Sequence, residues 1–162
     1  MKTITLTQPF ASLIAVRAKC FETRSWRPTP PYYGPIAIHA SKGFPPEARE
    51  LLNNDRFSGP LYRAGLLRDD PWRNANFWKA LPLGAVVAIG QIALYLPTDL
   101  AAKDVTLHAS ADETYFGDYT PGRWAWWIKR VRILPEPIPA KGSLNFWEWD
   151  PPAEVLELVK EV

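Results

Sequence analysis

The run Lys19-Cys20-Phe21-Glu22-Thr23-Arg24-Ser25-Trp26 is the densest polar cluster of this 162-residue chain, and its pattern is that of a strand. Alternate residues of a strand share one face and lie about 7 Å apart. We therefore expect Glu22, Arg24 and Trp26 on one face, with Lys19 leaning towards it from just before the strand. A carboxylate, a guanidinium, an indole and an ammonium then meet over a small area. The alternative is a solvated Glu22–Arg24 pair of little energetic value.

The composition limits the class of protein. Apolar residues make up 47% and charged residues 22% of the chain, as in ordinary globular domains. The single cysteine excludes a disulfide framework and a cysteine-based zinc site, and the sequence predicts neither a metal site nor a cofactor. The apolar runs are too short to cross a bilayer, and the first residues lack the apolar core of a signal peptide. These features predict a soluble, cytoplasmic protein without a membrane partner.

The charge is unevenly distributed. The net charge is only +2, but residues 1–68 carry ten Lys/Arg against four Asp/Glu, while residues 133–162 carry two against six. A basic first half favours an anionic partner such as nucleic acid or a nucleotide. Eight tryptophans are more than a core of this size needs, which leaves some free to stack on a flat ligand.

The remaining pattern predicts an α+β fold: a small, mostly antiparallel β-barrel of about six strands with short helices covering its openings. Seventeen prolines disfavour long helices. Strands are expected over 2–7, 20–26, 35–41, 84–96 (bulged near Gly90), 123–133 and 144–149. Helices are expected over 7–19, 45–53, 70–81 (Pro71 at its first position), 98–103 and 150–160, with an irregular stretch between the second and third.

Three runs carry a resemblance to a known family: Leu6-Thr-Gln-Pro-Phe-Ala-Ser-Leu-Ile14, Lys19–Trp26 and Gly34-Pro-Ile-Ala-Ile-His-Ala-Ser-Lys42. They resemble the opening of an ASCH (activating signal cointegrator homology) domain, most closely that of the transcriptional coactivator. The family signature Gly-x-Lys-x-x-Glu-x-Arg is matched at Lys19, Glu22 and Arg24 but not at its glycine, two positions before Lys19. Residues 141–147 resemble the closing Gly-x-x-x-Trp element. The resemblance implies a single domain over 1–162, with a core of about 3–149, a variable insertion at 49–76 and a C-terminal helix over 150–162.

The resemblance implies a PUA-like barrel whose cleft carries the signature, in a family with many RNA- or DNA-binding members. Lys19, Glu22 and Arg24 then become cleft residues that bind nucleic acid. Arg24 suits a phosphate or a base edge, and Trp26 suits an unpaired base. Ser41 and Lys42, which end a neighbouring strand, complete the expected site. The expected partner is RNA or single-stranded DNA, or a nucleoside or nucleotide, and the sequence does not indicate an oligomeric state.

Two alternatives remain open. Small ASCH-like amidohydrolases act on N4-acylcytidine with a Lys, a Thr three residues later and a distant Glu, and ribonuclease activity also occurs among ASCH domains. Lys19 and Glu22 would be the catalytic residues here, but Glu22 stands where a Thr is expected and should raise the pKa of Lys19. The distant carboxylate would be Asp112, Glu113 or Asp118. The other alternative is a protein-interaction module that uses exposed tryptophans and proline-rich loops.

Overall fold

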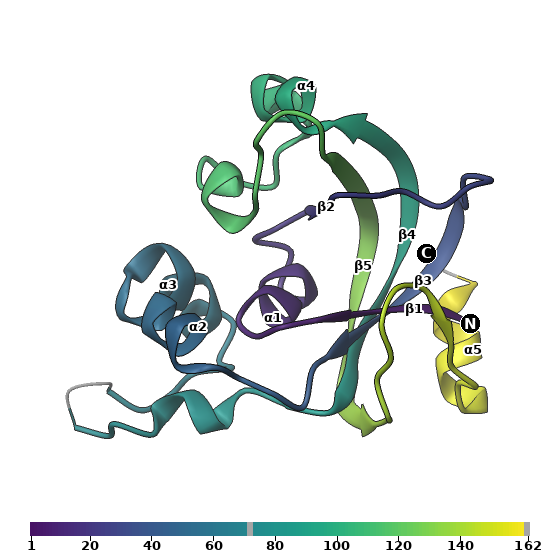
Figure 1. Ribbon diagram of the computed structural model, residues 1–162. Helices are drawn as coiled ribbons and strands as arrows, with labels where there is room; N and C mark the ends of the chain where they lie inside the picture. Colours follow the sequence, from purple (N-terminus) through teal and green to yellow (C-terminus); the bar gives the residue numbers. More distant parts are fainter. Residues whose placement is uncertain (71–72, 161–162) are drawn as a thin grey trace.

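A curved six-stranded sheet forms the centre of the protein in a computed structural model that describes residues 1–70 and 73–160 (Figure 1). The strand order is β2-β5-β4-β3-β1-β6. The strands are β1 (Lys2–Leu6), β2 (Phe21–Arg24), β3 (Gly34–Ala40), β4 (Ala85–Pro97), β5 (Trp124–Pro139) and β6 (Trp147–Glu148). Only β1 and β3 pair in parallel, and the other neighbours are antiparallel. The predicted α+β class with a mostly antiparallel sheet is confirmed.

The sheet curls but does not close into a barrel. The two long strands β4 and β5 shift register between Ile89 and Gln91, which confirms the bulge expected near Gly90 and bends the sheet there. At the other side, β2 forms one edge of the sheet and does not pair with β1 or β6. Instead, the side chain of Arg24 on β2 donates a hydrogen bond to the Thr5 carbonyl oxygen on β1 at 3.0 Å. The expected closed barrel is therefore an open, curled sheet whose edges are bridged by a side chain.

Helix α1 (Phe10–Ala15) is shorter than the helix expected over 7–19. Arg17 takes a left-handed backbone conformation with φ of 61°, and the amides of Ala18 and Lys19 both donate to the Leu13 carbonyl. This pattern ends a helix and is usually supplied by a glycine. The left-handed residue therefore stands two positions before Lys19, where the signature has its glycine, and the turn brings Lys19 directly to the start of β2.

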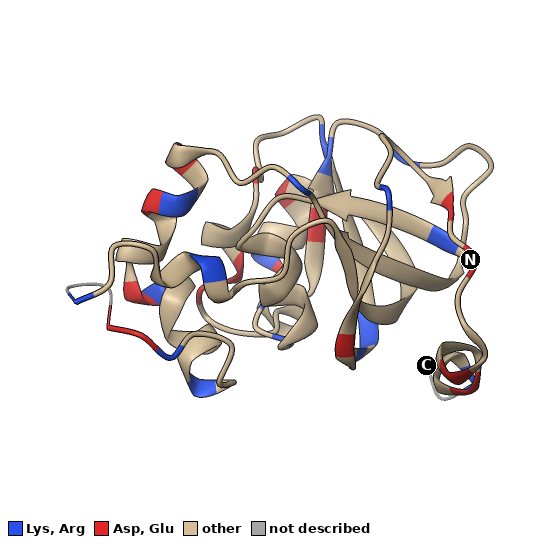
Figure 2. Cartoon of the chain, turned by 90° about the horizontal axis from the view of Figure 1, so that it is seen from below, with Lys and Arg blue, Asp and Glu red and all other residues tan. Residues whose placement is uncertain are grey.

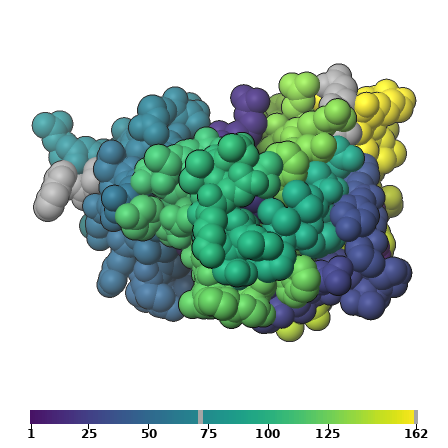
Figure 3. All heavy atoms as spheres, turned by 90° about the horizontal axis from the view of Figure 1, so that it is seen from above, coloured from purple at the N-terminus to yellow at the C-terminus, as the bar shows by residue number. Residues whose placement is uncertain are grey.

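A helical lobe lies beside the sheet (Figures 1 and 3). It comprises α2 (Pro46–Glu50), η1 (Leu51–Asn53), α3 (Asp55–Arg63) and η2 (Phe77–Ala80). The expectation of an irregular stretch after residue 53 is wrong, because the Asn54 side chain caps α3 and its residues Phe57 and Leu61 are buried. The helix expected over 70–81 is also wrong where it is described, since only η2 forms there. Pro71 lies outside the described residues.

The remaining helical elements follow β4 and β6 in the chain. They are α4 (Thr98–Lys103), η3 (Val105–Leu107), η4 (Glu113–Phe116) and α5 (Ala153–Val159). The strand expected over 144–149 is limited to β6, and α5 begins after Pro152 rather than at Asp150. The charged residues of α5 are the acidic Glu154 and Glu157 (Figure 2). Within residues 1–70 and 73–160, no helix has the length and apolar character needed to cross a membrane.

Candidate functional site

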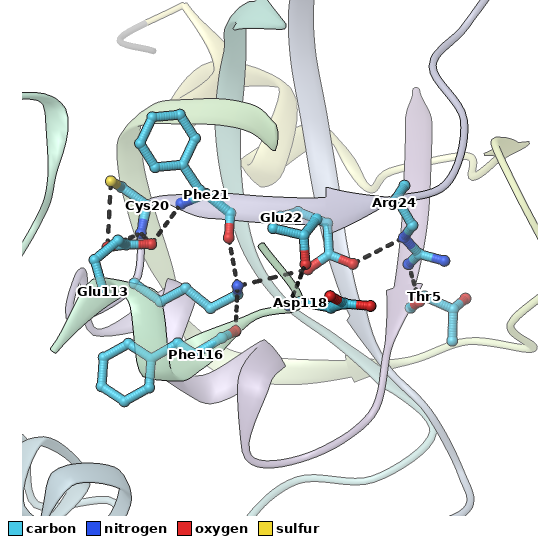
Figure 4. A network of polar contacts seen from close by, with 10 residues as sticks. Thr5, Cys20, Phe21, Glu22, Arg24, Glu113, Phe116 and Asp118 are labelled. Carbon is cyan, nitrogen blue, oxygen red and sulfur yellow. Dashed lines mark hydrogen bonds and ion pairs between the residues drawn. The ribbon is translucent and has the colours of Figure 1, made fainter. Parts of the chain in front are cut away.

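Lys19 is the buried centre of the signature. Its side chain is 1% exposed, and its ammonium donates to the main-chain carbonyls of Phe21 and Phe116, the latter at 2.6 Å (Figure 4). Nζ lies 3.9 Å from the Glu22 carboxylate. Burial lowers the pKa of Lys19, opposed first by the negative charge of Glu22. The expectation that Glu22 dominates and raises this pKa is therefore wrong, because desolvation is the larger effect.

Glu22 and Arg24 continue the chain of charges from Lys19 towards solvent. Arg24 Nε lies 2.8 Å from Glu22 Oε1 as a close ion pair, and the Glu22 side chain is 10% exposed against 27% for Arg24. The other end of the guanidinium donates to the Thr5 carbonyl. The three signature side chains converge, as strand alternation indicates. They are, however, bound to one another and to the main chain, which leaves only part of Arg24 facing solvent.

Glu113 is one of the three carboxylates that the sequence offers as the distant catalytic residue. It is fully buried and accepts hydrogen bonds from the amides of Cys20 and Phe21 at 2.9–3.1 Å and from Ala109 at 3.4 Å. Burial, followed by the charge of Glu113, raises the pKa of the Cys20 thiol to about 12. This carboxylate therefore fixes the start of β2 rather than facing a ligand. The other candidates pair elsewhere: Asp112 with Arg56 at 2.8 Å and Asp118 with Arg123 at 3.2 Å.

A small pocket of about 320 Å³ opens beside Glu22. Its walls include Phe10, Tyr115 and Phe116, and its polar groups include the carboxylates of Glu22 and Asp118. No Lys or Arg lines it among the described residues. Both carboxylates already have cationic partners, Glu22 in Arg24 and Asp118 in Arg123, and the described lining of the pocket offers no cation to a phosphate. The immediate surroundings of the signature thus do not form a phosphate site.

Trp26 borders a second, larger depression of about 680 Å³. Its ring is partly exposed and packs edge-to-face on Trp126 and Phe146, with ring centroids 4.8 and 6.0 Å apart. The same depression is lined by Tyr32 and Arg27. It combines aromatic surface with a cation, a pairing found where single-stranded nucleic acid binds.

Ser41 and Lys42 lie in another groove, which occupies about 830 Å³ at the ends of β3 and β4. Lys42 is exposed, and Ser41 Oγ donates to the Gly43 carbonyl. The side chain of Thr5, whose carbonyl binds Arg24, also lines this groove. The predicted residues are therefore spread over three depressions: Glu22 in one, Trp26 in the next, and Ser41 and Lys42 in the third.

The sequence did not indicate Thr5 or Lys141 as parts of these sites, and it indicated Glu113 only as a possible catalytic carboxylate. Thr5 acts through its carbonyl, which residue type does not reveal. Glu113 was one of three equivalent carboxylates, and nothing in its spacing distinguished it. Lys141 lies in the closing Lys141–Trp147 run that supported the resemblance, and it lines the groove of Lys42. Its place directly before Gly142, the glycine of the closing element, is the only feature of the sequence that draws attention to Lys141.

Comparisons with known proteins agree with this geometry at the level of the fold. No family model and no curated protein matches the sequence. The crystal structure of ASCH from Zymomonas mobilis is similar, with a TM-score of 0.54 and 15% identity over 98% of this chain and 93% of that one. The fold is that of an ASCH protein. A point mutant of the Zymomonas mobilis ASCH protein gives the same TM-score and identity over 96% of its chain.

Proposed function

We propose that the chain is an ASCH domain protein that binds single-stranded nucleic acid, RNA or DNA. The observation that carries the proposal is the pair of depressions that border residues 141–146. One holds Lys42 and Lys141, and the other holds Trp26, Tyr32 and Arg27. Neither is lined by a carboxylate from the described residues. Binding of a single strand needs cations along its backbone and aromatic rings that stack on its bases.

The signature has a supporting role in this proposal. Arg24 is held by Glu22 and by the Thr5 carbonyl, so only part of its guanidinium is left for a ligand. Lys19 is too deeply buried to contact a phosphate. The membership of the ASCH family rests on the match of Lys19, Glu22 and Arg24 together with the fold, and the likeness to the coactivator type rests on the Leu6–Ile14 run.

The test is binding of a fluorescently labelled oligonucleotide, as RNA and as single-stranded DNA, over a series of salt concentrations. Lys42→Ala should weaken binding and reduce its salt dependence, because one phosphate contact is lost. Trp26→Ala should weaken binding with little change in salt dependence, since stacking is not ionic. Lys103→Ala is the matched control: this exposed lysine on α4 lines neither depression.

Two results would overturn the proposal. One is a wild-type protein that binds neither oligonucleotide at low salt, which would favour the protein-interaction alternative. The other is an equal loss of affinity in Lys42→Ala and Lys103→Ala, which would indicate unspecific attraction to basic surface.

The hydrolase alternative is tested separately by the release of cytidine from N4-acetylcytidine. A general base needs a free lone pair within reach of the substrate. Lys19 instead donates to two carbonyls and is closed off from solvent. We expect no turnover above that of Lys19→Ala. Turnover that disappears in Lys19→Ala would place catalysis at the signature after all.

A further inference from the structure

The groove lined by Lys42 and Lys141 has features that the binding of a nucleic-acid backbone does not require. It lies where β3, β4 and β5 end, under the segment that leads to β6, and it occupies about 830 Å³. This volume lies within the range of small-molecule sites. Its lining comprises Thr5, His39, Ser41, Lys42, Leu83, Gly84 and residues 139–144.

The groove is positively charged without compensation. Lys42 and Lys141 are both exposed, and neither has an ion-pair partner among the residues that the structure describes. None of the described lining residues is acidic. Two ammonium groups on the walls of one groove attract an anion that carries more than one negative charge.

Part of the remaining lining is apolar. Leu83 and Pro139 are part of it, and Leu144 is 87% exposed at its border. A leucine this exposed offers unburied apolar surface beside two cations. A ligand that fills the groove therefore needs a flat or apolar part in addition to its charge. An inorganic anion would leave this surface in water.

The floor of the groove is fixed in place by the fold. Main-chain hydrogen bonds link Ser41 to Leu6, Gly84 to Ser41 and Ala140 to Gly84 at 2.8–3.3 Å. His39, which is 1% exposed, donates from Nε2 to the Ala140 carbonyl at 3.0 Å and packs edge-to-face on Trp147. These contacts hold the overlying segment on the sheet, so a ligand does not have to order it on binding.

His39, which belongs to this floor, also has a hydrogen-bond acceptor that the described residues leave free. Because Nε2 of His39 donates to a carbonyl, Nδ1 of the neutral ring is an acceptor, and it lacks a hydrogen-bond partner within the described part of the chain. A β-carbon added to Gly142 would lie 2.8 Å from this atom and 2.4 Å from Cε1. Glycine at position 142 thus allows the segment to pass close over the imidazole.

We propose that this groove is a site for a nucleoside monophosphate, with the phosphate between Lys42 and Lys141 and the base against Leu83, Pro139 and Leu144. The inference rests on the proposed function and sharpens it: the groove takes one nucleotide unit as a separate ligand, without a strand and without the depression of Trp26. A single phosphate dianion matches the two ammonium groups, and a base matches the apolar wall.

The experiment is isothermal titration of the full chain with cytidine monophosphate and adenosine monophosphate, and with cytidine and inorganic phosphate as partial ligands. Both monophosphates should bind, and each partial ligand should bind at least tenfold more weakly. The double variant Lys42→Ala/Lys141→Ala should weaken monophosphate binding at least tenfold. Lys103→Ala should leave it unchanged. Leu144→Asp, at an exposed position that tolerates a polar side chain, should weaken it as well.

The outcomes separate this inference from the proposed function. Absence of monophosphate binding at millimolar concentration overturns the inference even if oligonucleotides bind. Phosphate that binds as tightly as the monophosphates also overturns it, because the apolar wall would then contribute nothing. Monophosphate binding that depends on both lysines, in a protein that binds no oligonucleotide, supports the inference and refutes the proposed function.

Discussion

The signature network and the Lys42 groove use cations in opposite ways. Lys19 is enclosed, and its hydrogen bonds and ion pair are to two carbonyls and one carboxylate of the chain. Lys42 and Lys141 are exposed and have no ion pair within residues 1–70 and 73–160. The signature residues that identify the fold therefore stabilise it, while less distinctive lysines remain available to a ligand. A motif conspicuous in the sequence can hold a site together without being its contact surface.

The strongest test of the stabilising side is Glu113→Ala. This change leaves the buried amides of Cys20 and Phe21 without an acceptor, and unsatisfied buried groups cost about 1–3 kcal/mol each. We expect the free energy of unfolding to fall by about 3 kcal/mol in urea denaturation. Glu113→Gln keeps one acceptor oxygen and should lose less. A Glu113→Ala protein as stable as wild type would contradict the structural role.

Lys19→Met should separate stability from binding. The apolar side chain fills similar space but leaves the Phe116 carbonyl without its donor and removes the positive charge beside Glu22. Breaking a buried pair costs about 3 kcal/mol when one charge is left alone. Because Arg24 still pairs with Glu22, we expect a smaller loss of about 2 kcal/mol. In the remaining folded protein, the salt dependence of oligonucleotide binding should be unchanged, and a lower dependence would show that Lys19 contacts phosphate.

Lys42→Ala should show the reverse pattern. Substitution of an exposed, unpaired lysine changes stability by less than about 0.5 kcal/mol. The slope of the logarithm of the binding constant against the logarithm of salt concentration should fall by about 0.7 for a single strand. Parallel unfolding and anisotropy measurements on the same preparation check both values. A destabilised protein with an unchanged slope would place Lys42 among the structural cations.

The smallest expected effect concerns the floor of the groove. Burial lowers the pKa of His39 below 6.5, and its hydrogen bond to Ala140 opposes this only in part. Below about pH 6.5, His39 takes up a proton in the unfolded chain but stays neutral in the folded one. The free energy of unfolding therefore falls as the pH drops from 6.5 to the lowered pKa of the folded state. Unfolding free energies of wild type and His39→Gln, measured at pH 7 and pH 5, should differ more at pH 7. Equal differences at both values would contradict a buried neutral imidazole.

The sequence predicted the framework better than the connections. Alternation located β1–β4 to within about two residues, and Gly90 correctly indicated the bulge in β4. The end of β5 was predicted too early, because the strand continues past Ile133 to Pro139. The prediction over 53–70 was wrong because Asn54 caps a helix that contains Pro60, and a proline beyond the first turn argues against a helix in any reading of sequence alone. The long helix over 7–19 was wrong because Arg17 takes a backbone conformation usual for glycine.

The site was predicted in part for a physical reason. Strand alternation places Glu22 and Arg24 on one face, and the structure has them in contact. Burial of Lys19 depends on a hydrogen bond to the Phe116 carbonyl, 97 residues along the chain. A local sequence pattern cannot predict a contact between residues so far apart. The other lysine of the groove, Lys141, is separated from Lys42 in the sequence by the helical lobe, β4 and β5. The joint role of these two lysines follows only from the fold.

The hydrogen bond from Arg24 to Thr5 also bears on self-association. β6 pairs with β1 only at Lys2 and Thr3, so the main chain at Thr5 would otherwise present an open edge of the sheet. Such edges recruit strands from other molecules and start aggregates. The guanidinium occupies the Thr5 carbonyl, and a strand added there would have to displace a charged group held by Glu22. One arginine thereby blocks the edge of β1 against a second copy of the chain.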